Sequence, residues 1–209
     1  MQVEANTRHG MLNMIIAHHF ILTGYGHWLP NDPRGSMSRQ TLSAKLAPLG
    51  KGHYGRRKPQ PSRQELKQFH RRAGELLDHA VLWFEDAERQ ALTDALGQVV
   101  RFEGLTCYAC AVVSSHVHIL VRKHRLKGEE MLSLLKEAGR RALHQRGRFP
   151  ADHPVFSTDS CDVYKSDPQA VRNCIAYISD QYRKHGLTPM ACDFISPYDD
   201  WPFHKQKKK

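Results

Sequence analysis

The chain has 209 residues, 40% hydrophobic and 25% charged, which suits one globular domain or one domain with an insertion. No apolar run is long enough to span a membrane, the N-terminal stretch is not a signal peptide, and the five cysteines are odd in number, so we expect a cytoplasmic protein and no disulfide scaffold. The formal net charge of +10 favours a polyanionic partner, with nucleic acid the first candidate, over a neutral small molecule.

The N-terminal part predicts one strand followed by a long basic loop. Residues 13–23 are rich in β-branched and aromatic side chains and are closed by Gly24 and Gly26, which is typical of a strand and its turn. Residues 30–62 hold several prolines and glycines and predict a long loop, which is usually functional or disordered. Between Pro33 and Gln64 there are eight basic residues and no acid: Arg34, Arg39, Lys45, Lys51, Arg56, Arg57, Lys58 and Arg63.

The middle of the chain predicts two helices and a hairpin. Apolar residues recur at helical spacing in 63–78 and in 85–101, with a short extended piece between them. Residues 105–121 are dense in Val, Cys, Tyr and Ile and are interrupted at Ser114-Ser115. We therefore expect two strands joined by a tight turn.

The last third predicts a helix, a short strand and another helix. Residues 128–145 carry one apolar face, acids in the first turn and basic residues late, in agreement with the helix dipole. A short strand is expected within 154–163. Asp167-Pro168 then begins a helix over 169–185, which Gly186 ends.

This order of elements predicts an α+β fold: a ferredoxin-like antiparallel sheet with helices on one face, plus a long basic N-terminal loop and an extra helix. We expect one domain over 1–209, with its core in about 13–190, a basic loop at 30–62 and a cationic tail at 203–209.

A pair of histidines lies at the start of an apolar strand. Alternation along a strand sends the His116 and His118 rings to one face, where two neutral imidazoles can share a divalent metal. The 14 histidines of the chain would produce about one His-x-His pair by chance, so spacing alone means little. The setting argues more strongly, because a buried strand has no other need for polar rings.

Tyr177 and Gln181 are four residues apart and share a face of the predicted last helix. A tyrosine hydroxyl attacks a phosphodiester only when cations polarise the phosphate and stabilise the phenolate. A core tyrosine with its hydroxyl at the surface is the simpler interpretation of Tyr177 taken alone. Tyr164 and Tyr182 are rival nucleophiles.

Three segments together resemble a known family. TGYGHWLPNDPRGS near the N-terminus, HVHILV in the predicted hairpin and YISDQ in the last helix, in this order over about 13–190, resemble the REP-associated tyrosine transposases and the related transposases of small insertion sequences. These enzymes belong to the histidine-hydrophobic-histidine superfamily of single-strand DNA nucleases.

The resemblance implies a reaction and a role for each matching residue. His116 and His118 match the metal-binding pair, Tyr177 the nucleophile, and Gln181 the polar residue that completes the metal site. The implied reaction is cleavage and rejoining of single-stranded DNA, dependent on Mg²⁺ or Mn²⁺, through a 5′-phosphotyrosine intermediate. Ser114-Ser115 stands where many relatives have Pro-Asn or Pro-Asp, and Gln181-Tyr182 is closer to the insertion-sequence branch.

The basic residues predict where DNA binds. Trp28 offers a stacking surface and Arg34 a phosphate contact, although the turn that holds them is equally consistent with a structural role. Arg56, Arg57 and Lys58, beside further stacking side chains, are candidates for gripping a DNA hairpin.

Other functions stay open at this stage. The protein could bind DNA hairpins without cutting them, as a domesticated relative would. A third class, a nuclease of duplex nucleic acid that uses water, would need several carboxylates near the histidines, and the sequence offers none close by. The active unit is a monomer or a homodimer.

Overall fold

The computed structural model describes residues 14–36, 44–158 and 160–203. Its helices and strands, in chain order, are β1 (Ala17–Thr23), the 3₁₀-helix η1 (Ala44–Leu49), α1 (Arg63–Leu76), α2 (Asp86–Phe102), β2 (Cys107–Val112), β3 (His116–Arg122), α3 (Gly128–Gln145), β4 (Cys161–Lys165), α4 (Pro168–Ser179) and α5 (Gln181–His185). None of the described helices is long and apolar enough to cross a bilayer.

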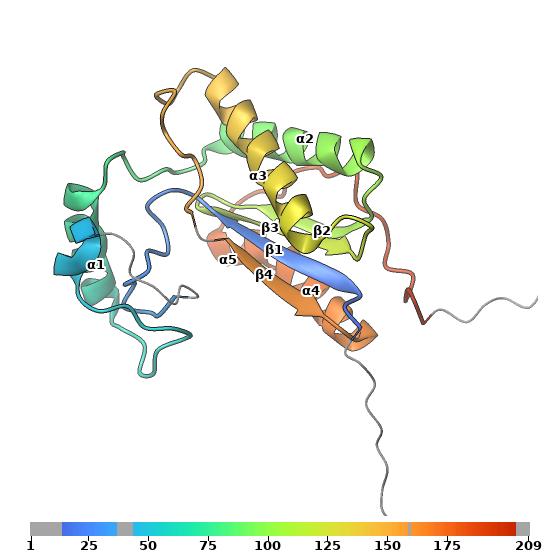
Figure 1. Cartoon of the computed structure of the whole chain (residues 1–209), viewed down its shortest axis with the longest axis horizontal. Coiled ribbons are helices and arrows are strands. Elements are labelled where there is room, and N and C mark those ends of the chain that lie inside the picture. Colours follow the sequence, from blue (N-terminus) through green and yellow to red (C-terminus); the bar gives the residue numbers. More distant parts are fainter. Residues whose placement is uncertain (1–13, 37–43, 159, 204–209) are drawn as a thin grey trace, which may run out of the picture.

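The described strands form one antiparallel sheet in the order β2-β3-β1-β4, so the expected α+β fold with an antiparallel sheet is confirmed (Figure 1). The order follows from the connections: β2 and β3 form the predicted hairpin, while α2 and α3 carry the chain from β1 to β2 and from β3 to β4. This is the ferredoxin-like arrangement. Its centre is the β1–β3 pair, in which Thr23 lies opposite His116 and Ile21 opposite His118.

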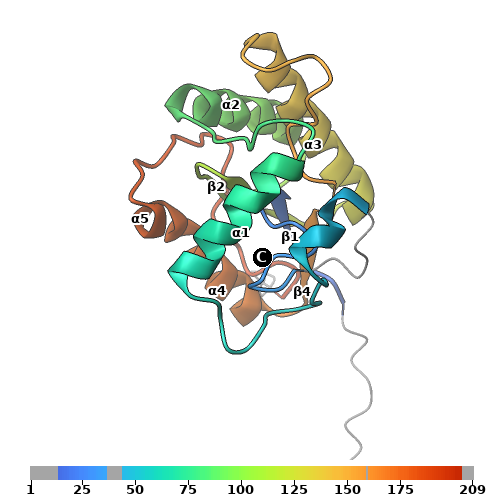
Figure 2. The same ribbon diagram turned by 90° about the vertical axis from the view of Figure 1, so that its left-hand side faces the viewer.

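Helices cover both faces of the sheet, which corrects the expectation of helices on one face (Figure 2). The two crossover helices α2 and α3 do share a face, where Phe20 of β1 and Ile119 of β3 pack in the larger apolar core. The added helix α4 buries Val171 and Ile178 on the opposite face, in a second core. Successive side chains of β1 and β3 point to opposite faces of the sheet, so the apolar residues of these strands contribute to both cores.

The last predicted helix is divided at Asp180 into α4 and α5. Asp167 caps α4 by accepting from the amide of Ala170 at 2.8 Å, and Pro168 occupies the first turn, as the sequence indicated. Gly186 ends α5 in the left-handed conformation, with φ 64°.

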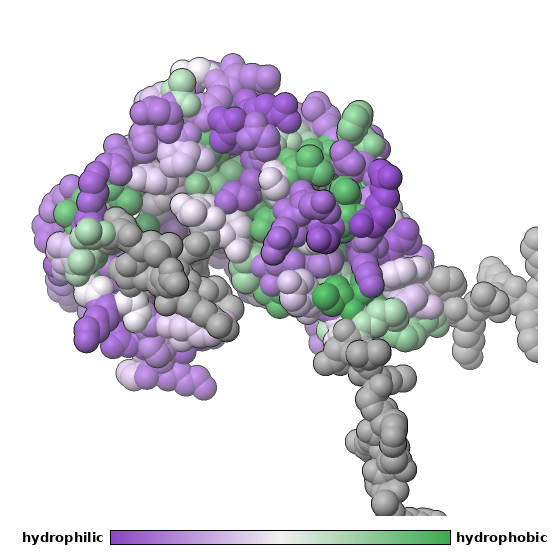
Figure 3. Space-filling view, in the orientation of Figure 1, coloured by the Kyte–Doolittle hydropathy of each residue, from purple (hydrophilic) through white to green (hydrophobic). Residues whose placement is uncertain are grey.

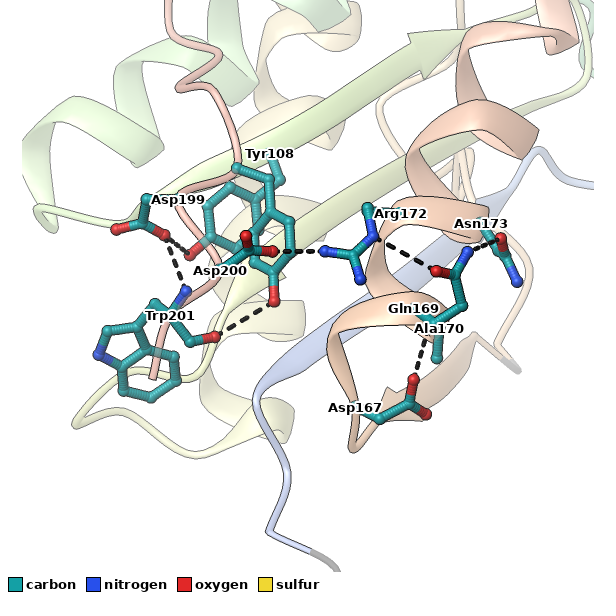
Figure 4. A network of polar contacts seen from close by, with 10 residues as sticks. Tyr108, Asp167, Gln169, Ala170, Arg172, Asn173, Asp199, Asp200 and Trp201 are labelled. Carbon is teal, nitrogen blue, oxygen red and sulfur yellow. Dashed lines mark hydrogen bonds and ion pairs between the residues drawn. The ribbon is translucent and has the colours of Figure 1, made fainter. Parts of the chain in front are cut away.

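The chain after α5 ties α4 to the sheet (Figure 4). The Tyr108 hydroxyl of β2 donates to Asp199 at 3.2 Å, and Arg172 of α4 forms an ion pair with Asp200. Arg122, at the end of β3, lies over the ring of Trp201. These contacts fix the orientation of the helix that carries Tyr177.

The segment 30–62 is less irregular than expected, because part of it folds into a lobe with α1. Leu29, Leu46 of η1, and Phe69 and Ala73 of α1 form a small apolar core separate from those of the sheet. The lobe lies beyond one end of the sheet (Figures 1 and 2). We call residues 28–36 and 44–77 the α1 lobe.

One close approach holds the α1 lobe together. The amide of Arg57 donates to the carbonyl of Arg34 at 2.9 Å, and Gly35 has a φ of 93°. A Cβ on Gly35 would lie 1.8 Å from the carbonyl oxygen of Gly55, so only glycine fits there.

Candidate active site

The face of the sheet that α4 covers carries a group of histidines. Alternation along β3 places His116 and His118 on this face, as predicted, and His19 of the neighbouring strand β1 joins them. His185, at the end of α5, lies with its ring centroid 5.4 Å from that of His116. We call His19, His116, His118 and His185 the histidine cluster.

Short contacts connect the rings. The Nε2 atoms of His116 and His118 are 3.0 Å apart. The Nδ1 atom of His118 is 2.9 Å from Nε2 of His19, and Nδ1 of His116 is 3.0 Å from the hydroxyl of Ser115. Ser115, which comes directly before the first histidine in the sequence, thus also contacts its ring.

Burial keeps these imidazoles neutral at physiological pH. It lowers the pKa of His116 to about 4 and that of His118 to about 2, with the neighbouring imidazoles acting in the same direction. Burial, with a smaller effect of Lys165, lowers the pKa of His19 to about 4. Neutral imidazole is the form that binds a metal ion.

Tyr177 lies beside the cluster in the same chain. Its ring meets those of His118 and His19 edge to face, with centroids 5.4 and 6.1 Å apart, and the Lys184 ammonium is 4.5 Å from its centroid. Tyr177 is 46% exposed, so a substrate can reach it. This exposure does not fit a core tyrosine with only its hydroxyl at the surface.

Gln181 is nearly fully buried at the start of α5. Its side-chain amide donates to the backbone carbonyl of Tyr177 at 3.0 Å, which fixes the turn that carries the tyrosine. The structure places no hydrogen bond between Gln181 and either His116 or His118.

The donor set fits a small divalent cation. If both Nδ1 atoms carry their protons, His116 donates to Ser115 and His118 donates to His19, which leaves both Nε2 lone pairs unprotonated and adjacent. Their 3.0 Å separation is about that of neighbouring corners of an octahedral site with ligand bonds near 2.1 Å. Within the described residues no group of three or more His, Cys, Asp or Glu side chains is placed to hold a metal, so substrate oxygens and water would supply the other ligands.

Three members of the site were missed in the sequence: His19, His185 and Lys184. His19 follows from strand pairing, because the β1–β3 register alone brings it beside His118. The His18-His19 doublet inside a predicted strand was the available signal, since one of two consecutive rings must face each side of the sheet. The positions of His185 and Lys184 beside the cluster depend on the break in the helix at Asp180, and no sequence pattern predicted that break.

The two rival tyrosines occupy different environments. The Tyr182 hydroxyl is buried and accepts a hydrogen bond from the Val112 amide at 3.1 Å, so it serves packing between α5 and β2. Tyr164 of β4 is exposed but packs edge to face on His18, which belongs to the sheet face opposite the histidine cluster.

Trp28 and Arg34 lie on the α1 lobe, in contact with each other. The Arg34 guanidinium is 3.8 Å from the centroid of the Trp28 ring, and its Nε and Nη2 donate to the two Asp32 oxygens at 2.9 and 2.6 Å. Asp32 is buried, so the charge of Arg34 is already paired. The indole of Trp28 is 44% exposed.

Arg56, Arg57 and Lys58 are exposed on the same lobe. Among the described residues none of the three side chains forms an ion pair. Of the expected cationic tail at 203–209, residues 204–209 lie outside the described residues.

The chain resembles known proteins in its structure and not in its overall sequence. No family model matches the sequence, and no curated protein matches it. Among the similar solved structures is a REP-associated tyrosine transposase bound to a REP hairpin, at 12% identity and a TM-score of 0.45, covering 83% of this chain and 70% of that one. Another is a candidate transposase from Deinococcus radiodurans R1, at 14% identity and a TM-score of 0.38, covering 87% of this chain and 98% of that one.

Proposed function

We propose that the protein is a metal-dependent endonuclease and strand transferase of single-stranded DNA, with Tyr177 as its nucleophile. The observation that carries the proposal is the approach of an exposed tyrosine ring to a pair of neutral imidazoles with adjacent Nε2 atoms, all within one chain. An exposed phenol, two neighbouring imidazole nitrogens and a nearby ammonium are the groups that a phosphodiester transfer needs.

Each group has a part in the reaction. The Tyr177 oxygen attacks the scissile phosphorus, a phosphorus–oxygen bond to tyrosine forms, and the bond to the 3′ oxygen breaks, which leaves a 3′ hydroxyl and a 5′-phosphotyrosine. Attack by a 3′ hydroxyl reverses these changes and rejoins DNA without a further energy source. Lys184 supplies positive charge beside the ring, where the phosphate would lie.

His116 and His118 would hold the metal, with Gln181 as the further ligand that we propose from the sequence. The ion, when bound, polarises the phosphate as a Lewis acid. Two imidazole nitrogens favour Mn²⁺ over Mg²⁺, because Mg²⁺ is the harder ion and takes oxygen ligands. Ser115 and His19 act as positioning residues that hold the two rings.

The partner that we propose is a DNA hairpin with a single-stranded flank. The exposed cations of the α1 lobe, Arg56, Arg57 and Lys58, support binding to the phosphate backbone, and Trp28 supports stacking on a base. Arg34 holds Trp28 in place and already shares its charge with Asp32, so we give it the smaller part in phosphate binding.

The test is covalent capture. Wild-type protein incubated with a labelled hairpin oligonucleotide and Mn²⁺ should form an adduct that survives denaturant, and Tyr177→Phe should form none while still binding the DNA. Tyr164→Phe is the matched control, because it removes an exposed hydroxyl from the opposite face and should leave the adduct unchanged. An adduct in Tyr177→Phe overturns the assignment, and binding without any wild-type adduct would identify a hairpin-binding protein that does not cut.

A further inference from the structure

A cavity of about 640 Å³ lies between the α1 lobe and the end of the sheet where β3 begins. Trp28 and the α1 side chains Lys67 and Arg71 line it from the lobe, and Ser115 and His185 line it from the side of the sheet. Trp83, in the segment that joins α1 to α2, completes the wall. The volume is within the range of sites that enclose a small organic ligand.

The cavity presents two large aromatic rings to solvent. Trp28 is 44% exposed and Trp83 is 56% exposed, although both are held in place. The His27 ring meets Trp83 edge to face with centroids 4.5 Å apart, and His27 is itself fixed by its donation to the Leu82 carbonyl at 2.9 Å. Exposed and immobilised indoles are the platforms on which nucleic-acid bases stack.

The same cavity has uncompensated positive charge. Lys67 and Arg71 are one turn apart on α1, so both side chains reach the same face of the helix. Neither forms an ion pair or a hydrogen bond among the described residues, and no acidic side chain lines the cavity. A nucleotide could bind here with its base stacked on the indoles and its phosphate beside Lys67 and Arg71. Figure 3 shows hydrophilic residues, with some apolar ones among them, on the part of the lobe that is visible in that view.

The cavity is continuous with the candidate active site. Ser115 lines the cavity and contacts the Nδ1 atom of His116 at 3.0 Å. His185 also lines it, and its ring contacts the ring of His116. A group bound in the cavity therefore lies within a side chain's length of the imidazole pair.

We propose that this cavity binds one unpaired nucleotide of single-stranded DNA next to the cleavage site, with its base on the indoles of Trp28 and Trp83 and its phosphate on Lys67 and Arg71. The inference rests on the proposed function and adds a binding subsite to it. A base inside a duplex cannot enter such a cavity, so the subsite selects a strand that is already unpaired. It also fixes the register of the strand relative to Tyr177.

The test measures binding in the Tyr177→Phe protein without metal, so that cutting cannot contribute. A labelled single-stranded oligonucleotide is replaced, one position at a time, by versions that lack one base. Removal of the bound base should weaken affinity about 5- to 150-fold, the equivalent of one stacked base. Trp83→Ala should weaken binding of the intact strand to a similar extent, and Trp83→Leu guards against a variant that fails to fold.

The decisive result is non-additivity. In Trp83→Ala, removal of the bound base should cost little more affinity, because the ring and the base lose the same contact. Phe102→Ala, at a ring 89% exposed on α2, is the control and should leave the base dependence unchanged. Full additivity at every position would overturn the subsite.

The cations are tested by salt dependence. Lys67→Gln and Arg71→Gln should each reduce the slope of log affinity against log salt by about 0.7, the value for one phosphate contact on a single strand. Arg125→Gln is the matched control, because Arg125 is exposed beyond the opposite end of β3 and has no ion pair among the described residues. Equal slopes in all three variants would overturn the phosphate contact.

The outcomes separate the two proposals. If wild-type protein cuts a hairpin but the variants bind normally, the cavity is wrong and the function stands. If the base and Trp83 are coupled but wild-type protein forms no covalent adduct, the subsite stands and the cutting reaction is wrong.

Discussion

His19 offers the sharpest test of the site, because its hydrogen-bond partner within the site is His118. The Nε2 atom of His19 is 2.9 Å from Nδ1 of His118, and both rings are nearly fully buried. Replacing His19 with Phe keeps a ring in the space and removes the hydrogen-bond partner. In the tautomer that leaves Nε2 of His118 available to a metal, His118 then loses the acceptor for its Nδ1 proton.

The expected magnitude follows from that one contact. Loss of a hydrogen-bond partner behind a metal ligand weakens metal affinity by about 10- to 100-fold, or about 1.4 to 2.7 kcal/mol. A buried donor left without a partner costs a similar amount, about 1 to 3 kcal/mol. We therefore expect calorimetric titration with Mn²⁺ at pH 7.5 to show a dissociation constant raised by one to two orders of magnitude in His19→Phe, with Mg²⁺ weaker throughout.

The neighbouring histidine is the matched control. His18 lies on the same strand with similar burial, but its ring faces the other side of the sheet and pairs with Asp162 at 2.9 Å. His18→Phe should change Mn²⁺ affinity less than about threefold even if it lowers stability. Wild-type affinity in His19→Phe, or equal losses in the two variants, would refute the role that we assign to His19.

Three further predictions concern stability, measured by urea unfolding. Gly35→Ala should lose about 2 kcal/mol or more and weaken DNA binding, because its Cβ would meet the Gly55 carbonyl at 1.8 Å; no loss would contradict the close approach. Arg89→Leu should lose about 2 to 4 kcal/mol, since this buried guanidinium donates to the carbonyls of Val112 and Thr188; a neutral effect would mean that water replaces it. In metal-free protein, His19 has its ordinary pKa of 6.5 in the unfolded chain but a pKa of about 4 in the folded chain. Protonation therefore favours the unfolded chain, and the free energy of unfolding should fall by about 2 kcal/mol for this residue between pH 7.5 and pH 5. A His19→Phe variant with the same pH dependence as wild type would exclude His19 as the origin of this loss.

The sequence predicted the elements whose signals are local. The helix expected at 128–145 has those bounds in the structure, because an apolar face and the order of its charges both act within one segment. The hairpin turn at Ser114-Ser115 is likewise where expected, between β2 and β3. The strand expected within 154–163 is displaced to Cys161–Lys165, since pairing with β1 decides which residues become strand.

Features that depend on distant partners could not be predicted. The position of α4 on the second face requires knowing that Val171 and Ile178 pack on the far side of β2 and β3. The α1 lobe escaped prediction because its core joins Leu29, Leu46 and Phe69, which lie far apart in a segment full of proline and glycine.

The candidate site divides in the same way. Strand alternation was enough to place His116 and His118 on one face of the sheet. Helical spacing was enough to predict that Tyr177 and Gln181 share one face of a helix. The third imidazole of His19, the ammonium of Lys184 and the cavity at Trp83 each required the register of two strands or the path of a connecting segment.

The separate core of the α1 lobe has an evolutionary consequence. Because Leu46, Phe69 and Ala73 pack among themselves and not on the sheet, changes within this lobe need not disturb the strands that carry the imidazoles. Under the proposed function, descendants of such a protein can acquire new DNA targets through changes in the lobe while the histidine cluster stays unchanged. Exchange of the lobe between relatives would then redirect the proposed cleavage to another target.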